Sequence, residues 1–84
     1  MSEAKGMVKI MEEKILKILE ENCEEALDYD GNSMMEDGVI DSYTILNTVN
    51  DLEEEFGIEI AAENVTASNF RNKNAIIELV EKII

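Results

Sequence analysis

The stretch SYTILNTVNDLEEEFG, residues 42–57, has the spacing of an amphipathic helix. Apolar side chains recur along it at three- and four-residue steps, which places them on one helix face. These residues are Ile45, Leu46, Val49, Leu52 and Phe56. Gly57 follows at the position where a helix C-cap is expected. The pattern predicts a helix over residues 42–56 that packs through one face.

Two further segments carry the same periodicity, one toward each end of the chain. An apolar stripe runs along residues 4–22 with Lys and Glu on its other side, and a second stripe follows Asn72, which suits an N-cap. The spacing predicts helices over residues 4–22 and from the residue after Asn72 to the C-terminus. The side chains expected to form the core are Val8, Met11, Ile15, Ile18, Ile45, Val49, Leu52, Phe56, Ile76, Leu79 and Val80.

The two connecting segments are less regular. Residues 22–41 span about twenty positions, which is long for a compact domain and signals either function or an unrecognised turn of structure. Residues 58–71 have irregular apolar spacing, which suits a short helix or a pair of turns better than a strand. Because no repeat or low-complexity linker interrupts the chain, we expect one domain over residues 1–84. The predicted fold is all-α, a four-helix bundle with three long helices and one short helix.

The charge of the chain limits its partners. The 84 residues contain 20 acids and 7 bases, a formal net charge of −13, and all of it lies in residues 22–68, which contain no Lys or Arg. Phosphates would repel so acidic a chain, so nucleic acid is excluded as a partner and basic protein surfaces are favoured. No apolar run is long enough to insert into a membrane. We expect a cytoplasmic monomer.

The residue types also limit the chemistry. Because the chain has no histidine, it lacks Ser-His-Asp and Cys-His pairs and Cys/His zinc clusters, so we expect neither an enzyme nor a metal centre. Residues 28–32, DYDGN, begin like an EF-hand loop, but Ser33 and Val39 stand where glycine and a bidentate glutamate are required. The single cysteine, Cys23, is expected to pack as a small hydrophobe.

Asp41 and Ser42 stand at the start of the helix predicted over residues 42–56. A serine hydroxyl at this position lies beside backbone N–H groups that have no partner within the helix. A phosphate ester on Ser42 would therefore meet the positive end of the helix macrodipole. For an isolated Asp-Ser pair, the simpler interpretation is that Ser42 is an N-cap.

The sequence around this pair resembles the acyl carrier protein family. The resemblance is carried by residues 36–43, EDGVIDSY, and residues 52–60, LEEEFGIEI, at the spacing found in that family. Its small, acidic, helical members carry 4′-phosphopantetheine on the serine of an Asp-Ser pair at the start of their second helix. The likeness covers nearly the whole chain. The loop before Ser42 and residues 68–72, SNFRN, look more like stand-alone D-alanyl-type carriers than like fatty-acid carriers.

The resemblance implies that Ser42 is the attachment point of 4′-phosphopantetheine, and that Asp41 assists a phosphopantetheinyl transferase and its metal. The thiol of the arm would hold an acyl or aminoacyl group as a thioester. A loading enzyme and a downstream acyltransferase or synthase would bind through basic docking surfaces. The matching partner-binding positions are Tyr43, Leu46, Asn47, Asn50, Glu53 and Glu54. Fatty-acid carriers commonly have Leu directly after the serine and further acids in the first turns of this helix, whereas this chain has Tyr43, Asn47 and Asn50. This difference argues against recognition by fatty-acid synthase enzymes.

A second interpretation requires no modification of the chain. In it the protein is a non-enzymatic acidic helical adaptor that binds a basic partner, and Ser42 only caps the helix. Under the carrier interpretation, Met34 and Met35 line a path for an attached chain. Under the adaptor interpretation, residues 53–55, EEE, are a solvated helix face.

Overall fold

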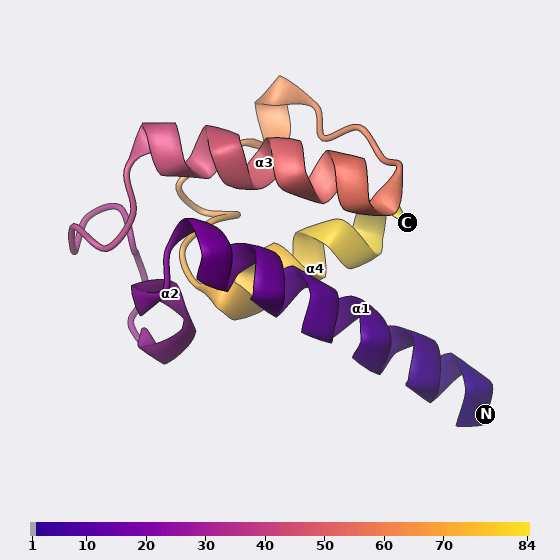
Figure 1. Ribbon diagram of the computed structural model, residues 1–84. Helices are drawn as coiled ribbons and strands as arrows, with labels where there is room; N and C mark the ends of the chain where they lie inside the picture. The colour runs from indigo at the N-terminus through magenta and orange to yellow at the C-terminus, as the bar shows by residue number, and fades with distance from the viewer. Residues whose placement is uncertain (1) are drawn as a thin grey trace.

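The computed structural model describes residues 2–84, with side chains from residue 9 onward. Its elements in chain order are α1 (Ser2–Asn22), α2 (Glu25–Asp28), α3 (Ser42–Phe56), the 3₁₀ turn η1 (Ala62–Asn64) and α4 (Lys73–Ile83). Every regular element in this part of the chain is helical, which confirms the predicted all-α class. Helix α1 contacts both α3 and α4, and the connection from α2 to α3 loops out where α3 begins (Figure 1).

The ends of α3 and α4 follow the predicted signals. Gly57 ends α3 with a left-handed φ of 62°, and its N–H donates to the carbonyl of Glu53. Asn72 caps α4, where its Oδ1 accepts a hydrogen bond from the N–H of Ala75 at 2.9 Å. Helix α1 ends at the predicted residue and begins at Ser2 rather than at residue 4. The capping residues therefore located the end of α3 and the start of α4 correctly, whereas α4 ends at Ile83 and not at the C-terminal residue.

The fourth α-helix lies in the connection between residues 22 and 41. It is α2, a single turn, whereas residues 58–71 form turns that include η1. Helix α2 is held by tertiary contacts, because Ala26 is fully buried and Lys73 Nζ donates to the carbonyl of Leu27 at 2.8 Å. A helix this short has little stability of its own. Four residues also carry too little periodicity to reveal it in the sequence.

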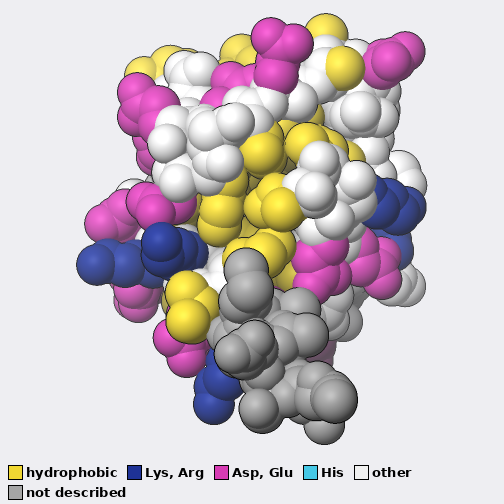
Figure 2. Space-filling view, turned by 90° about the vertical axis from the view of Figure 1, so that its right-hand side faces the viewer, with side chains coloured by type: hydrophobic (Ala, Val, Ile, Leu, Met, Phe, Trp, Pro, Cys, Tyr) yellow, Lys and Arg dark blue, Asp and Glu magenta, His cyan; other side chains and the backbone are white. Residues whose placement is uncertain are grey.

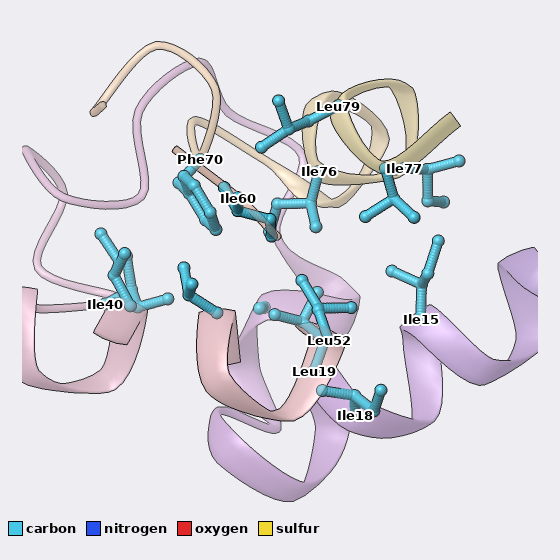
Figure 3. Close-up of a cluster of buried hydrophobic side chains, with 14 of the residues drawn as sticks. Ile15, Ile18, Leu19, Ile40, Leu52, Ile60, Phe70, Ile76, Ile77 and Leu79 are labelled. Atoms are coloured by element: carbon cyan, nitrogen blue, oxygen red, sulfur yellow. The ribbon is translucent and has the colours of Figure 1, made fainter. Parts of the chain in front are cut away.

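The core lies between α1, α3 and α4, as Figure 3 shows. The predicted core residues that are buried are Ile15, Ile18, Ile45, Val49, Leu52, Ile76, Leu79 and Val80. Met11 and Phe56 were expected in the core but are only partly buried, because they lie near the end of the bundle where α3 stops. The side chain of Val8 lies outside the described residues.

The irregular connections complete the core. Met34 and Ile40 are buried from the connection before α3, and Ile60 and Phe70 from the segment after it. Buried side chains therefore fix both connections against the bundle. Because these side chains follow no helical or strand period, periodicity alone did not select Met34, Ile40 and Ile60 for the core.

The acidic middle of the chain has few internal counter-charges. The ion pair between Lys14 Nζ and Glu55 Oε2, at 3.2 Å, is the only one among the side chains that the structure describes. We therefore expect added salt to raise the melting temperature, because salt screens the repulsion between acids. A magnesium salt should raise it more than a sodium salt at equal molar concentration, because its ionic strength is higher. Thermal unfolding followed by circular dichroism measures this. A melting temperature that stays constant or falls would contradict the expectation.

Gly57 provides a test of the α3 terminus. Its φ of 62° lies in the left-handed region, where a Cβ is strained even though no atom lies within 4 Å of the added carbon. Gly57→Ala is expected to lower the free energy of unfolding by about 1 kcal/mol. Gly57→Asn should cost less, because asparagine tolerates this conformation better than alanine. Urea unfolding of both variants gives the values, and equal losses would contradict the explanation.

Candidate functional site

Asp41 is the N-cap of α3. Its backbone is extended, with φ −117° and ψ 175°, and its Oδ1 accepts a hydrogen bond from the N–H of Thr44 at 2.8 Å. Hydrogen bonding from Thr44 stabilises the charged carboxylate and lowers the pKa of Asp41 below its ordinary value of 3.8. The side chain is exposed. A negative charge is therefore held in water beside the positive end of the helix.

Ser42 is the first residue of α3, and its side chain is exposed. Because Asp41 accepts the capping hydrogen bond, the interpretation of Ser42 as the N-cap is wrong by one residue. In the described part of the chain, no hydrogen bond joins the Ser42 hydroxyl to another residue. The hydroxyl is thus accessible at a helix terminus whose first N–H groups have no partners within the helix.

The backbone just before the site is anchored in the core. Ile40 is buried, and the N–H groups of Val39 and Ile40 both donate to the carbonyl of Met34, at 2.8 and 3.2 Å. The N–H of Met34 in turn donates to the carbonyl of Arg71 at 3.0 Å. These contacts tie the loop to the segment that precedes α4. Asp41 and Ser42 are therefore presented by a fixed backbone although their side chains are exposed.

A second contact folds the outer part of this loop. The Tyr29 hydroxyl donates to Asp37 Oδ2 at 2.5 Å and accepts from the N–H of Ser33 at 2.7 Å. Desolvation and the hydrogen bond to Asp37 raise the pKa of Tyr29 above its ordinary value of 10.0. The ring lies so close to Gly31 that a Cβ there would sit 2.4 Å from the hydroxyl oxygen. Sequence reasoning missed this arrangement, since no spacing rule pairs Tyr29 with Asp37.

A hollow opens beside Ser42, between the start of α3 and the segment after η1. Its volume is about 210 Å³, and apolar surface predominates in it. The lining residues are Met35, Ser42, Ile45, Leu46, Val65, Thr66 and Ala67. Of the two methionines expected to line a path for an attached chain, Met35 lines this hollow, whereas Met34 is buried in the core. The structure thus places an apolar surface next to the serine hydroxyl.

Most of the residues predicted to bind partners lie on the outer side of α3. They are spaced at three- and four-residue steps, opposite the buried stripe of Ile45, Thr48, Val49 and Leu52. Tyr43 is 73% exposed and Leu46 is 58% exposed, and Asn50 is also exposed. Asn47 is half-buried. The outer side therefore presents two large apolar side chains close to Ser42.

The two predicted glutamates differ in their surroundings. Glu53 lies at the edge of the buried stripe and is half-buried, and its Oε2 accepts a hydrogen bond from the N–H of Ile60 at 2.8 Å. Glu54 is exposed and borders an acidic hollow of about 280 Å³ between α1 and α3, together with Glu21, Asp51 and Glu55. Glu53 thus holds the segment after α3, while Glu54 contributes to the negative surface.

Other possible sites are less developed. Among the described residues, no group of three or more His, Cys, Asp or Glu is arranged to hold a metal ion. None of the helices in residues 2–84 combines the length and apolar character needed to cross a bilayer.

Cys23 packs against the core as predicted, and its thiol donates to the carbonyl of Val39 at 3.1 Å. This contact adds to the anchoring of the loop before Ser42.

The chain matches no protein-family model, no curated protein and no solved structure. The features that bear on function lie at the start of α3 and around it. Three features converge there: the capped helix terminus, the exposed Ser42 hydroxyl and the apolar hollow.

The Asp41 cap predicts a specific pH dependence. Because its pKa is lower in the folded than in the unfolded state, the ionised carboxylate stabilises the fold at pH values above 3.8. This stabilisation is lost as the pH falls below 3.8 and through the lowered pKa. Asp41→Asn keeps a capping oxygen but cannot ionise.

Urea unfolding of the wild type and Asp41→Asn, from about pH 6 to about pH 3, isolates this group from the other acids. The wild type should lose stability relative to the variant as the pH falls. Asp41→Ala, which removes the cap altogether, should be the least stable of the three at neutral pH. A stability difference between wild type and Asp41→Asn that is independent of pH would contradict the assigned cap.

Proposed function

We propose that this protein is a carrier that holds an acyl or aminoacyl group as a thioester on 4′-phosphopantetheine attached to Ser42. The observation that carries the proposal is that Asp41, and not the adjacent Ser42, caps the helix. Asp41 accepts the capping hydrogen bond, so the exposed Ser42 hydroxyl has no structural role to give up when it is modified. The resemblance of this segment to the acyl carrier protein family supplies the identity of the attached group.

The chemistry at Ser42 is the transfer of a phosphoryl-linked group. The serine oxygen forms a bond to phosphorus, a pyrophosphate bond of coenzyme A breaks, and the nucleotide half of coenzyme A leaves. The hydroxyl proton passes to a base on the transferase. The resulting phosphodiester lies at the N-terminus of α3, where unpaired N–H groups and the macrodipole favour an anion. The attached group supplies the thiol that forms the thioester.

Asp41 has a second proposed role at the modification step. Its carboxylate is exposed beside Ser42 and ionised at neutral pH, since its pKa is lowered. A transferase that binds a divalent cation with the pyrophosphate would meet this carboxylate next to the nucleophile. Asp41 thus combines a structural hydrogen bond with a charge that a partner enzyme can use.

The surroundings of Ser42 fit the presentation of a reactive cargo. The apolar hollow that Met35 and Leu46 line offers a surface for an attached chain. The exposed Tyr43 and Leu46 and the acidic residues of α3 offer a docking surface for partners with basic and apolar groups. The negative field of residues 22–68 would steer such partners toward this part of the chain.

The proposal is tested by loading the protein. The purified chain is incubated with coenzyme A, Mg²⁺ and a broad-specificity phosphopantetheinyl transferase, and its intact mass is measured. The wild type should gain the mass of one phosphopantetheinyl group. Ser42→Ala should gain nothing while its circular dichroism spectrum is unchanged, because the capping bond belongs to Asp41. Ser68→Ala, which removes another exposed serine hydroxyl, should load like the wild type.

Asp41→Asn separates the two roles of the carboxylate. It keeps a capping oxygen, so the fold should persist, but it removes the charge beside the nucleophile. Loading of this variant should be at least about tenfold slower than that of the wild type, which corresponds to about 1.4 kcal/mol in the barrier. If a transferase that loads a control carrier leaves the wild type unmodified, the carrier proposal fails and the acidic adaptor is favoured.

A further inference from the structure

A single phenol oxygen holds both ends of the turn that leads toward Ser42. Residues 33–38 form this turn, in which the N–H of Asp37 donates to the carbonyl of Ser33 at 3.0 Å. The Tyr29 hydroxyl accepts from the N–H of Ser33 at 2.7 Å and donates to Asp37 Oδ2 at 2.5 Å. We call these two hydrogen bonds of the hydroxyl the Tyr29 clasp. One side chain thus ties the start of the turn to its end.

The turn supplies one wall of the hollow beside Ser42. Met35 lies within the turn, between the two residues that the clasp holds, and it lines the hollow opposite residues 65–67. The backbone that follows is fixed independently, because Ile40 is buried and Asp41 caps α3. Movement of the turn would therefore displace Met35 and leave the start of α3 in place.

Gly31 shows that the chain makes room for the clasp. A Cβ at this position would meet the hydroxyl and the ring of Tyr29. The backbone of Gly31 does not itself require glycine, since the glycines with positive φ are Gly38 and Gly57 in the described part of the chain. The ring of Tyr29, and not the backbone conformation, is thus what restricts this position to glycine.

The clasp contributes more to position than to stability. Asp37 is exposed and Tyr29 is only half-buried, whereas Met34 and Ile40 anchor the same loop in the core. A hydrogen bond in contact with water adds little net free energy to folding. It does, however, select one arrangement of the turn among those that the exposed backbone could adopt.

We propose that Tyr29 and Asp37 are positioning residues of the Ser42 site. Their hydrogen bond holds the turn of residues 33–38, and the turn holds Met35 at the wall of the hollow. An enzyme that binds around Ser42 then meets an ordered surface and does not lose affinity by ordering it. The clasp follows from the geometry alone, whereas its effect on loading rests on the proposed carrier function.

The clasp is tested first without an enzyme. In a Tyr43→Phe background Tyr29 is the single tyrosine, so ultraviolet absorbance follows its ionisation as the pH rises. Desolvation and the hydrogen bond to Asp37 raise the pKa of Tyr29, and the charges of Asp37 and Asp30 add to this. Asp37→Ala should therefore lower the titration midpoint. Glu36→Ala, which removes the neighbouring exposed acid, should leave it unchanged.

Gly31→Ala disturbs the clasp without removing either partner, because the added Cβ displaces the Tyr29 ring. In Gly31→Ala and in Tyr29→Phe, the Ser33 amide should exchange its hydrogen at least about fivefold faster than in the wild type, the factor expected for one lost hydrogen bond. Circular dichroism checks that both variants are folded.

A control variant breaks a contact far from the loop. Lys14→Ala removes the ion pair with Glu55, which belongs to the last turn of α3. Figure 2 looks at the side of the molecule opposite the loop, where acidic and basic side chains are exposed. This variant should leave exchange at Ser33 unchanged, because the turn opens locally and not by global unfolding.

Loading by the transferase then tests the positioning role. Tyr29→Phe and Asp37→Ala should raise the KM for the protein substrate about fivefold with little change in kcat, because the Ser42 hydroxyl and Asp41 stay in place. Asp37→Asn keeps an acceptor for the Tyr29 hydroxyl and should restore most of the loss. Glu36→Ala removes the same charge as Asp37→Ala and should load like the wild type.

The outcomes separate the two proposals. Wild-type values of both the Tyr29 titration midpoint and the Ser33 exchange rate in Asp37→Ala would overturn the clasp. If these values change but Tyr29→Phe and Asp37→Ala load like the wild type, the positioning role is wrong and the carrier proposal stands. A wild type that is never loaded overturns the carrier proposal and, with it, the positioning role.

Discussion

The arrangement of the candidate site depends on one hydrogen bond, from the N–H of Thr44 to the carboxylate of Asp41. This bond pairs a free N–H of the first turn with a residue that lies outside the helix. The hydroxyl of the next residue, Ser42, is therefore not needed for capping. The bond is effective because the backbone before it is fixed: Ile40 is buried, and Met34 accepts two hydrogen bonds from the loop. An exposed site is thus built on a buried support, which is how a flexible-looking loop can present a serine in a defined position.

Much of the fold follows from local signals in the sequence. Helix α3 could be predicted from end to end because Asp41-Ser42, a clean apolar stripe and Gly57 all agree, and Asn72 located the start of α4 for the same reason. Helix α2 could not be predicted, since it depends on the burial of Ala26 and on Lys73, 46 residues away from its partner Leu27. The Tyr29 contacts with Asp37 and Ser33 also require the folded loop and have no sequence signature.

The candidate site was predicted in part. Ser42 and Tyr43 are exposed at the start of α3, and Leu46, which the apolar periodicity placed on the packing face, is also exposed. The simpler interpretation of the Asp-Ser pair makes Ser42 the N-cap, whereas the structure gives this role to Asp41. An Asp just before the first helical residue is itself an N-cap signal. Glu53 was treated as a surface acid, but its position beside the buried stripe turns it toward Ile60. Such errors arise because periodicity shows which face of a helix is buried, but it does not determine the orientation of residues at the edge of that face or the residue at which the helix begins.

The three consecutive glutamates at the close of α3 have a consequence for its motions. Acids oppose the partial negative charge at a helix C-terminus, whereas Asp41 complements the positive charge at the other end. Glu53 and Glu55 are restrained by Ile60 and Lys14, but Glu54 has neither contact. We expect α3 to be electrically polarised, with a final turn that frays more readily than the first. Fluctuations would then be concentrated about 20 Å from the serine, and the turn that bears it would stay ordered.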